Sequence, residues 1–458
     1  MGVMAALDHL EQTTQAVALP SRRTVTVALV WLAVPANAAV IVGLWVHGGN
    51  LTTRSAGDVL VGVARLTGLL CAYLALIQVL LLARIPALER AVGFDRLSVW
   101  HRWNGHATVD LLIAHVFFSF WGYAELDRYS LPKEIRTMIA GGIYPGMITA
   151  TIGTAFLVVV AWTSVVIVRR RLRYEWWYAV HFLAYAGIAL GWFHQIPTGN
   201  ELVLHPVVDA YWKSLYLVTL ALLVVFRLVA PLAAALRQRL RVAEVVAEGP
   251  GVVSLRIEGA RLPNAQAGQF FLWRFLTHGR WWTAHPFSLS AAPDGRSLRI
   301  TVKSLGDHSA KLATVPVGTR VLVEGPFGVF TEAARRHERI LLVAGGIGIT
   351  PIRALLEEVR GDAVLLYRVV DEDDVVFREE LDAIAARRGI RVEYVVGDHR
   401  AEDGARLLAP QHLRELVPDI EQRDVYVCGP PAMTDALLTR LRGAGVPRRH
   451  VHAERFAL

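Results

Sequence analysis

The chain has 458 residues, of which 54% are hydrophobic, and it carries a formal net charge of +8. The length allows two or three domains, and the hydrophobic fraction exceeds the roughly 45–50% of an ordinary soluble protein. This composition favours a chain that lies partly in lipid. The two cysteines, Cys71 and Cys428, offer neither a disulfide framework nor a zinc site.

Apolar runs long enough to cross a bilayer occupy the first half of the chain. About 20 apolar residues suffice for a spanning helix. A segment at 1–23 precedes the first run, and a soluble module begins near residue 239, where short strands alternate with Gly/Pro turns. The sequence predicts a six-helix membrane bundle within 24–235, with helices at 24–47, 57–83, 99–123, 147–168, 175–195 and 207–233.

Positive charge gathers in alternate loops between these runs. By the positive-inside rule these loops are cytoplasmic, which places both termini and the soluble half in the cytoplasm and the bundle in the cell (inner) membrane. The positive net charge therefore reflects the membrane topology of the chain, and no nucleic-acid partner is predicted. The first run imitates a secretory signal but continues to Val46, which favours a retained anchor. The loop arginines are Arg22, Arg23, Arg84, Arg90, Arg96, Arg169, Arg170, Arg171 and Arg173.

Histidines inside the apolar runs are the clearest functional signal in this half. His101 and His115 lie in the third helix, and His181 and His194 lie in the fifth. Fourteen residues (115 − 101) rotate by about 1400°, so the first two share a face and stand roughly 21 Å apart. One such histidine alone would be interpreted as a neutral group hydrogen-bonded between helices. Two facing pairs predict two b-type haems, His101 with His181 near the cytoplasm and His115 with His194 near the outside.

The spacing in the fifth helix departs from ideal geometry. His181 and His194 are 13 residues apart (194 − 181), which leaves them about 140° out of phase on an ideal helix. A locally tightened turn is therefore required. Gly187 and Gly191 lie between the two histidines and would tolerate one.

Other polar groups in the bundle receive weaker assignments. Arg65 lies inside the second helix, where a haem propionate would be its partner; the alternative is that its side chain extends to the outer interface. His106 is about half a turn out of phase with His115 and is assigned no haem. His47, at the outer end of the first helix, is expected at the interface.

The soluble half divides into two predicted domains. Dense short strands with Gly/Pro turns over 239–332 predict a small β-barrel. Strands and helices alternate over 336–458, which predicts a parallel, doubly wound α/β domain. Its "GGIGITP" turn keeps two glycines of a dinucleotide fingerprint, Gly346 and Gly348, while Pro351 suits the first turn of a helix whose N-terminus faces phosphates.

The motifs together resemble a known family. "HPFSLS", "GPFG", "GGIGITP", "CGPPAM" and a terminal "ERF" occur in the order of the ferredoxin–NADP reductase-like module. With the bis-histidine half in front, the chain resembles the ferric reductase and NADPH oxidase superfamily of transmembrane flavocytochromes. The resemblance covers nearly the whole chain beyond the first twenty residues and implies FAD, two b-type haems and NADPH, or NADH, as cofactors.

The resemblance implies roles for particular residues. A histidine and a phenylalanine, His285 and Phe287, stand where soluble relatives usually have arginine and tyrosine. Cys428, taken alone, is a small buried hydrophobe and no nucleophile. Phe456 would cover the flavin ring and move for the nicotinamide. The resemblance implies His285, Pro286, Phe287 and Ser288 at the flavin, Val302, Lys303, Gly306 and Ser309 toward its pyrophosphate, Gly346, Gly348, Thr350 and Pro351 at the nucleotide pyrophosphate, and Cys428, Gly429 and Pro430 beside the nicotinamide.

Nucleotide preference depends on the end of the second strand of the α/β domain. Arg368 is placed where an arginine meets the 2′-phosphate of NADPH. The neighbouring acidic run, Asp371 to Asp374, would repel that phosphate and suits NADH. The balance favours NADPH.

The implied function is electron transfer from cytoplasmic NAD(P)H through FAD and two haems to a small-molecule acceptor outside, with no protein partner required. Ferric chelates, oxygen and quinones stay open as acceptors, because Arg65 matches an arginine of animal NADPH oxidases while Ser119 replaces their histidine one turn beyond His115. One alternative is a membrane-anchored flavin reductase without haems that serves a separate redox partner. Another, a non-enzymatic binding protein, is disfavoured by the intact flavin and nucleotide motifs.

Overall fold

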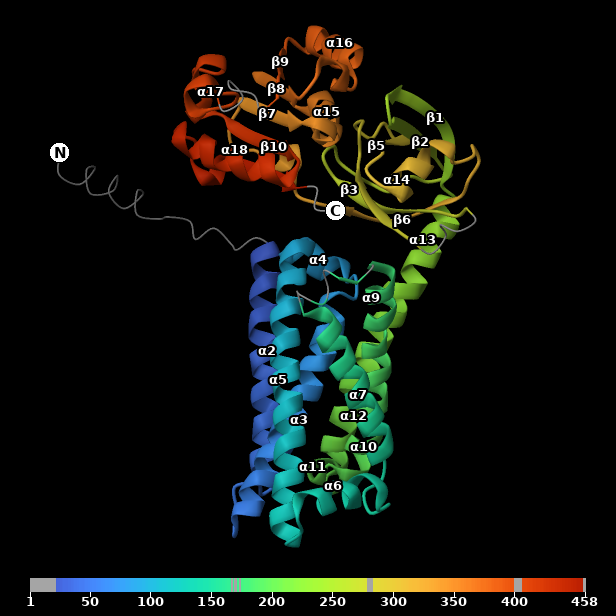
Figure 1. Ribbon diagram of the computed structural model, residues 1–458, viewed down its shortest axis with the longest axis vertical. Helices are drawn as coiled ribbons and strands as arrows, with labels where there is room; N and C mark the ends of the chain where they lie inside the picture. Colours follow the sequence, from blue (N-terminus) through green and yellow to red (C-terminus); the bar gives the residue numbers. More distant parts are fainter. Residues whose placement is uncertain are drawn as a thin grey trace, which may run out of the picture. The chain divides into compact units, whose positions relative to one another are not determined.

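The computed structural model of the chain describes residues 22–165, 168, 171–172, 174–277, 283–398 and 406–455. It divides into two compact units, Met1–Val229 and Ala230–Leu458. The first unit is helical, and the second combines β-sheets with helices (Figure 1). An apolar helical half followed by a half built of β-sheets and helices agrees with the sequence analysis.

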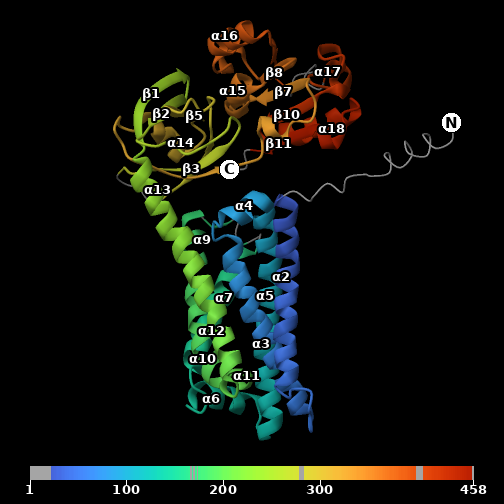
Figure 2. The same ribbon diagram turned by 180° about the vertical axis from the view of Figure 1, so that it is seen from behind.

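The first unit is a bundle of long helices. Helices α4 and α9 lie at one end of this bundle, and α6 and α11 lie at the other (Figure 1 and Figure 2). A π-helical turn, Val224–Val229, continues the last helix into α13 (Ala230–Gln238) of the second unit. The helices are α2 (Arg22–His47), α3 (Ala56–Leu81), α4 (Pro86–Val92), α5 (Phe94–Asp127), α6 (Leu131–Ala140), α7 (Met147–Ser164), α9 (Tyr174–His181), α10 (Leu183–Thr198), α11 (Asn200–Val203) and α12 (Pro206–Leu223).

Four helices of the described part are long and apolar enough to span a membrane: Ala56–Leu81, Arg96–Asp127, Met147–Ser164 and Pro206–Gln238. The sequence predicts six spans. The first of these contributes a shorter apolar helix, Leu32–His47, within the described residues. The fifth is divided into α9 and α10 at Phe182, so neither piece alone reaches spanning length.

Helices α3 and α5 pack closely because glycines lie between them. A Cβ on Gly57 would stand 2.8 Å from Leu126 Cγ, and one on Gly122 would stand 2.8 Å from Val61 Cγ2. Small residues let helix backbones approach closely in a membrane bundle. Ser55 caps α3 by accepting a hydrogen bond from the Asp58 amide at 3.1 Å. The α3–α5 pair is thus a tightly packed frame within the bundle.

The second unit begins with two antiparallel three-stranded sheets, which we call the β unit. The sheets have the orders β1-β2-β5 and β4-β3-β6, and bridges at Arg241↔Arg320 and Leu289↔Ile300 connect them. Alternate residues of the strands point into a shared core that includes Leu255, Phe271 and Trp273, all fully buried. The strands are β1 (Arg241–Gly249), β2 (Val252–Glu258), β3 (Phe270–Phe275), β4 (His285–Ser288), β5 (Ser297–Lys303) and β6 (Val321–Phe327), with the short helix α14 (Asp307–Ala310) after β5.

A five-stranded parallel sheet with helices on both faces follows, which we call the α/β unit. Its strand order is β11-β10-β7-β8-β9. Along β7, Leu342 points into the core formed with α15 and α16, whereas Leu341 points into the core formed with α17 and α18. Burial on both faces explains its uninterrupted apolar sequence. The elements are β7 (Ile340–Gly345), α15 (Ile349–Glu358), β8 (Ala363–Val369), α16 (Arg378–Arg388), β9 (Arg391–Val396), α17 (Pro410–Leu416), β10 (Asp424–Gly429), α18 (Pro431–Gly443) and β11 (Val451–Arg455).

Candidate functional site

The four membrane histidines meet as two pairs inside the bundle. The ring centres of His101 and His181 are 6.1 Å apart, and those of His115 and His194 are 6.3 Å apart. A metal bound at about 2 Å from one nitrogen of each ring requires ring centres roughly 6 Å apart. Each pair therefore has a spacing at which both imidazoles could bind one metal ion.

Helix α3 orients the two histidines of α5. Nδ1 of His101 donates to the Gln78 carbonyl at 3.0 Å, and Nδ1 of His115 donates to the Ala64 carbonyl at 2.8 Å. Because a carbonyl oxygen only accepts, the proton lies on Nδ1, and the Nε2 lone pair is left for a metal. Among the described residues, no group of three or more His, Cys, Asp or Glu side chains is placed to hold a metal ion. A haem needs only two protein ligands, since its macrocycle supplies the rest.

Two residues of α3 that the sequence analysis did not single out shape these positions. A Cβ on Gly68 would stand 2.6 Å from His115 Nδ1, so the glycine makes room for the imidazole. The Gln78 side chain accepts a hydrogen bond from Asn104 of α5 at 2.8 Å, which fixes the helix next to His101. Neither has a signal in one sequence, because an isolated glycine or glutamine in an apolar helix has many uses.

The fifth helix tightens immediately after His181, and not at Gly187 or Gly191 as the sequence analysis expects. The Phe182 amide bonds to the carbonyls of both Tyr178 and Ala179, each at 3.3 Å. The next contact, Tyr185 N to Phe182 O at 3.1 Å, spans three residues, as in a 3₁₀ turn. This turn adds about 20° of rotation per residue over its three residues, which supplies part of the missing rotation. Both histidines of the helix pair with histidines of α5.

The two glycines of the fifth helix serve packing instead. A Cβ on Gly153 of α7 would stand 2.8 Å from the Gly187 carbonyl and 3.2 Å from the Gly191 amide nitrogen. Glycines thus face each other where α7 and α10 cross. A glycine favours both close packing and local distortion, which is why the sequence alone did not separate the two roles.

Arg65 is half-buried in α3 and bonds to a loop. Its Nη1 donates to Asn50 Oδ1 at 3.1 Å, and Asn50 Nδ2 donates to the Trp45 carbonyl at 2.8 Å. His106 and His47 are exposed. The ring of His47 lies 6.0 Å from that of His205.

The predicted flavin motif forms strand β4 and pairs with β3. Ser288 is buried and lies opposite Phe270, while the Phe287 carbonyl accepts a hydrogen bond from Trp273 Nε1 at 2.9 Å. The rings of His285 and Phe287 stack with centres 6.3 Å apart. The sheet therefore fixes the backbone of the motif and presents its alternate side chains on two faces.

The residues predicted at the flavin pyrophosphate lie on β5 and the turn after it. Val302 is buried in the core of the β unit, and Lys303 pairs with Asp374 of the α/β unit at 3.0 Å. The hydroxyl of Ser309 accepts from the amides of Leu305 and Gly306 at 2.9 and 3.1 Å. The serine hydroxyl thus closes the turn, and the lysine ammonium connects the two halves of the second unit.

The nucleotide motifs meet at the switch point of the parallel sheet. In the sheet, β8 and β9 lie on one side of β7, and β10 and β11 lie on the other. The strand order therefore switches between β7 and β10. Open α/β sheets bind ligands at such a switch point, outside the carboxyl ends of the strands. A Cβ on Gly348 would stand 2.2 Å from the Cys428 carbonyl oxygen, and one on Gly345 would stand 2.2 Å from Met433 Sδ. The two glycine-containing loops therefore interlock at the carboxyl ends of these strands.

Other predicted nucleotide residues lie in the same loops. Thr350 is buried, and its hydroxyl donates to the Ile347 carbonyl at 3.1 Å. Pro351 lies in the first turn of α15, and Gly429 and Pro430 lead into α18. Burial raises the pKa of the Cys428 thiol well above its usual range, which fits a small apolar side chain and not a nucleophile.

Arg368 is placed at the end of β8, but its guanidinium is already engaged. It donates to the carbonyls of Val369, Val395 (3.1 Å) and Gly397. In the neighbouring acidic run, Asp374 pairs with Lys303, so part of that negative charge is compensated. Phe456 lies outside the described residues.

Three protein-family models match different parts of the chain. The ferric reductase like transmembrane component matches residues 67–192, the FAD-binding domain matches 237–331, and the oxidoreductase NAD-binding domain matches 342–438. The chain has the ferric reductase/NADPH oxidase-like architecture. This ferric reductase-like chain is therefore a membrane oxidoreductase with FAD and NAD(P)H binding modules.

Two similar curated proteins are named as reductases, and a similar solved structure is an FAD/NAD binding domain. Ferredoxin–NADP reductase B of Sorangium cellulosum is 31% identical over 37% of this chain and 77% of its own length. The ferredoxin reductase component of 3-ketosteroid-9-alpha-monooxygenase from Mycolicibacterium smegmatis is 34% identical over 47% of this chain, which spans 65% of that protein. The FAD/NAD binding domain of nitric oxide dioxygenase from Vibrio cholerae is 25% identical with a TM-score of 0.42, covering 48% of this chain and 99% of that structure.

Proposed function

We propose that this ferric reductase-like chain is a flavocytochrome b that passes electrons from cytoplasmic NAD(P)H across the membrane to a small-molecule acceptor outside. The observation that supports this most is the pair of bis-histidine sites, with ring centres 6.1 and 6.3 Å apart between α5 and the α9–α10 helix. Two such sites in one bundle are more than helix packing requires, and they suit two b-type haems.

Each part of the chain has a defined task in this proposal. When bound, FAD accepts a hydride and releases single electrons, and haem iron carries one electron at a time. The four histidines hold the two haem irons, and the carbonyls of Ala64 and Gln78 orient two of these ligands. The "GGIG" loop and the N-terminus of α15 receive the nucleotide pyrophosphate, because free amides and the helix dipole favour negative charge there. No side chain needs to act as acid, base or nucleophile.

The proposed topology has six spans in the cell membrane, with the divided α9–α10 helix counted as one. The arginine-rich loops support a cytoplasmic location for both termini and for the reductase module. We further propose domains at 24–235, 239–332 and 336–458, the middle one a closed FAD-binding barrel. Strand bridges at two edges of the β unit, Arg241↔Arg320 and Leu289↔Ile300, support that closure.

NADPH is the proposed donor, and NADH is its competitor. Partial compensation of the acidic run by Lys303 weakens the repulsion of a 2′-phosphate, while the engagement of Arg368 by three carbonyls weakens its attraction. Ferric chelates, oxygen and quinones are the proposed acceptors, and Arg65 is proposed to meet a haem propionate near the outer site.

The deciding experiment is an anaerobic absorption spectrum of the purified protein before and after NADPH, and again after a ferric chelate, a quinone or oxygen is added. A reduced b-haem spectrum after NADPH supports the proposal, and the acceptor that reoxidises it fastest identifies the activity. His101→Ala and His181→Ala should each remove one haem, and His115→Ala the other. His106→Ala is the matched control on α5, because that histidine is exposed.

A haem-free, membrane-anchored flavin reductase is the second candidate. It is favoured by the similar curated proteins, several of which are named as reductase components of separate systems. In that case NADPH bleaches only the flavin, dithionite reveals no haem bands, and the histidine variants match the parent protein.

A further inference from the structure

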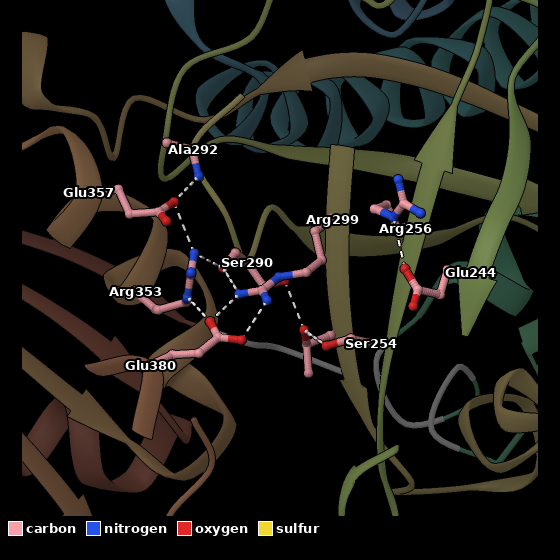
Figure 3. A network of polar contacts seen from close by, with 10 residues as sticks. Glu244, Ser254, Arg256, Ser290, Ala292, Arg299, Arg353, Glu357 and Glu380 are labelled. Atoms are coloured by element: carbon pink, nitrogen blue, oxygen red, sulfur yellow. Dashed lines mark hydrogen bonds and ion pairs between the residues drawn. The ribbon is translucent and has the colours of Figure 1, made fainter. Parts of the chain in front are cut away.

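A polar network joins the β unit to the α/β unit around one carboxylate (Figure 3). Glu380, in the first turn of α16, accepts hydrogen bonds from Arg299 of β5 through both oxygens, at 2.9 and 3.0 Å. The same carboxylate accepts from Arg353 Nε of α15 at 2.7 Å. Glu380 thus holds two arginines that belong to different units.

The two arginines also converge on one carbonyl. The Ser290 oxygen accepts from Arg299 Nη2 at 2.9 Å and from Arg353 Nη1 at 3.0 Å. Ser290 is fully buried and follows the flavin motif by two residues. The network therefore reaches the residues that directly follow strand β4, which carries the predicted flavin motif.

A second carboxylate extends the contact along α15. Arg353 pairs with Glu357 at 2.9 Å, and Glu357 accepts a hydrogen bond from the Ala292 amide at 2.7 Å. Phe377 lies beneath the network, with its ring centre 4.9 Å from Arg299 Cζ. Because α15 begins at the "GGIG" loop, its position sets where a bound nucleotide would lie.

Charge balance makes Glu380 the central member. Arg353 is 6% exposed, so its guanidinium is largely removed from water. Burial by itself raises the pKa of Glu380, but the hydrogen bonds and charges of Arg299 and Arg353 outweigh it and lower that pKa below its usual value. Without the carboxylate, two guanidinium groups would share one carbonyl, Arg299 would lose its ion pair with Glu380, and Arg353 would keep only Glu357.

We propose that Glu380 is a positioning residue for hydride transfer, which fixes the nucleotide-binding helix α15 against the flavin-binding strand β4 so that the nicotinamide reaches the flavin. The proposal rests on the proposed function of the second unit as an NAD(P)H–flavin reductase. A shift of about 1 Å between reacting groups slows a reaction by roughly 100-fold. The residues assigned to the nucleotide all lie in the α/β unit, so nucleotide binding should change much less than the transfer rate.

The test is Glu380→Gln in the full-length, FAD-loaded protein, with Glu379→Gln as the matched control. Glu379 lies in the same first turn and is exposed, so the control removes the same charge from the N-terminus of α16. Other contacts between the units persist in the variant, namely Lys303 with Asp374 and the Ala267 amide with Glu358. Flavin reduction is followed anaerobically by stopped flow over a range of NADPH concentrations.

We expect Glu380→Gln to lower the limiting rate of flavin reduction at least 10-fold, to change the half-saturating NADPH concentration less than threefold, and to retain FAD. Adding Arg299→Gln to it should restore part of the rate, because this removes one of the two opposed charges. A limiting rate within twofold of the parent overturns the proposal. If Glu380→Gln loses FAD, Glu380→Asp is measured in its place. A normal rate of flavin reduction in Glu380→Asp, or loss of FAD from it, would mean that Glu380 has only a structural role, which also overturns the proposal. Failure of the parent protein to reduce flavin with NADPH or NADH would instead refute the proposed function.

Discussion

Replacing Gly348 by alanine should disable nucleotide use while leaving the rest of the protein intact. The added Cβ would stand 2.2 Å from the Cys428 carbonyl oxygen and 2.6 Å from the carbonyl carbon. Since non-bonded heavy atoms rest about 3.5 Å apart, the loop must retreat from β10 by roughly 1 Å. These are backbone atoms of a central strand, so neither side can yield by a change of rotamer.

A displacement of this size in a group that positions the substrate costs roughly 100-fold in rate. Gly389→Ala, at the end of α16, provides the matched comparison outside the nucleotide loops. A Cβ there meets nothing within 4 Å, and its φ of +67° lies in the left-handed region, which costs an alanine about 1–2 kcal/mol. Gly389→Ala should therefore lower stability and keep the rate of flavin reduction within a few-fold of the parent.

Anaerobic flavin reduction by NADPH is the assay, with FAD content, the dithionite-reduced spectrum and the melting temperature as controls on folding. The reasoning is refuted if Gly348→Ala reduces flavin at the parent rate. It is also refuted if both alanine variants are equally impaired, since a general loss of stability and not the contact with β10 would then explain the slower reduction.

Two further predictions concern the bundle. Gly68→Ala would place a Cβ 2.6 Å from His115 Nδ1 and should weaken retention of one haem by roughly 10- to 100-fold, which is measured as haem content. Gly43→Ala is its control, because a Cβ there meets nothing within 4 Å. Equal haem content in the two variants contradicts the argument. Glu134 is fully buried, neither of its oxygens has a hydrogen-bond partner among the described residues, and burial followed by the charge of Asp127 raises its pKa. A raised folded-state pKa means that stability falls as pH rises from about 4.5 through that pKa. Glu134→Gln should therefore have a higher melting temperature than the parent at pH 7–8, and this difference should disappear toward pH 4. A difference in melting temperature that stays constant across that range would show that the carboxyl does not titrate in this way.

The sequence predicts those parts of the molecule that depend on periodicity. The apolar runs, the shared face of His101 and His115, and the alternation of strands and helices all follow from residue spacing. The family comparison confirms the ferric reductase-like architecture with FAD- and NAD-binding domains. The individual cofactor contacts remain predictions.

The parts that the sequence does not predict depend on contacts between distant residues. The tightened turn at Phe182 is set by backbone hydrogen bonds, and no residue type there marks it. The engagement of Arg368 depends on carbonyls of β9 and its following turn, which only the fold brings close. Likewise, the Arg299–Glu380 pair joins residues 81 positions apart, so neither partner has a local signature.

The hydrogen bonds between α3 and α5 have a consequence for how the membrane half can change. The acceptors Ala64 and Gln78 are separated by the same number of residues as the ligands His115 and His101 (78 − 64 and 115 − 101 are both 14). Between them, Cys71 Sγ contacts the Thr108 carbonyl at 3.4 Å in the same antiparallel register. Inserting or deleting one residue in either stretch would rotate one end by about 100°, so only one of the two imidazoles could keep its acceptor. The lengths of both segments are therefore fixed together. Substitutions can change the side chains along them, but they do not change the distance between the two histidine pairs.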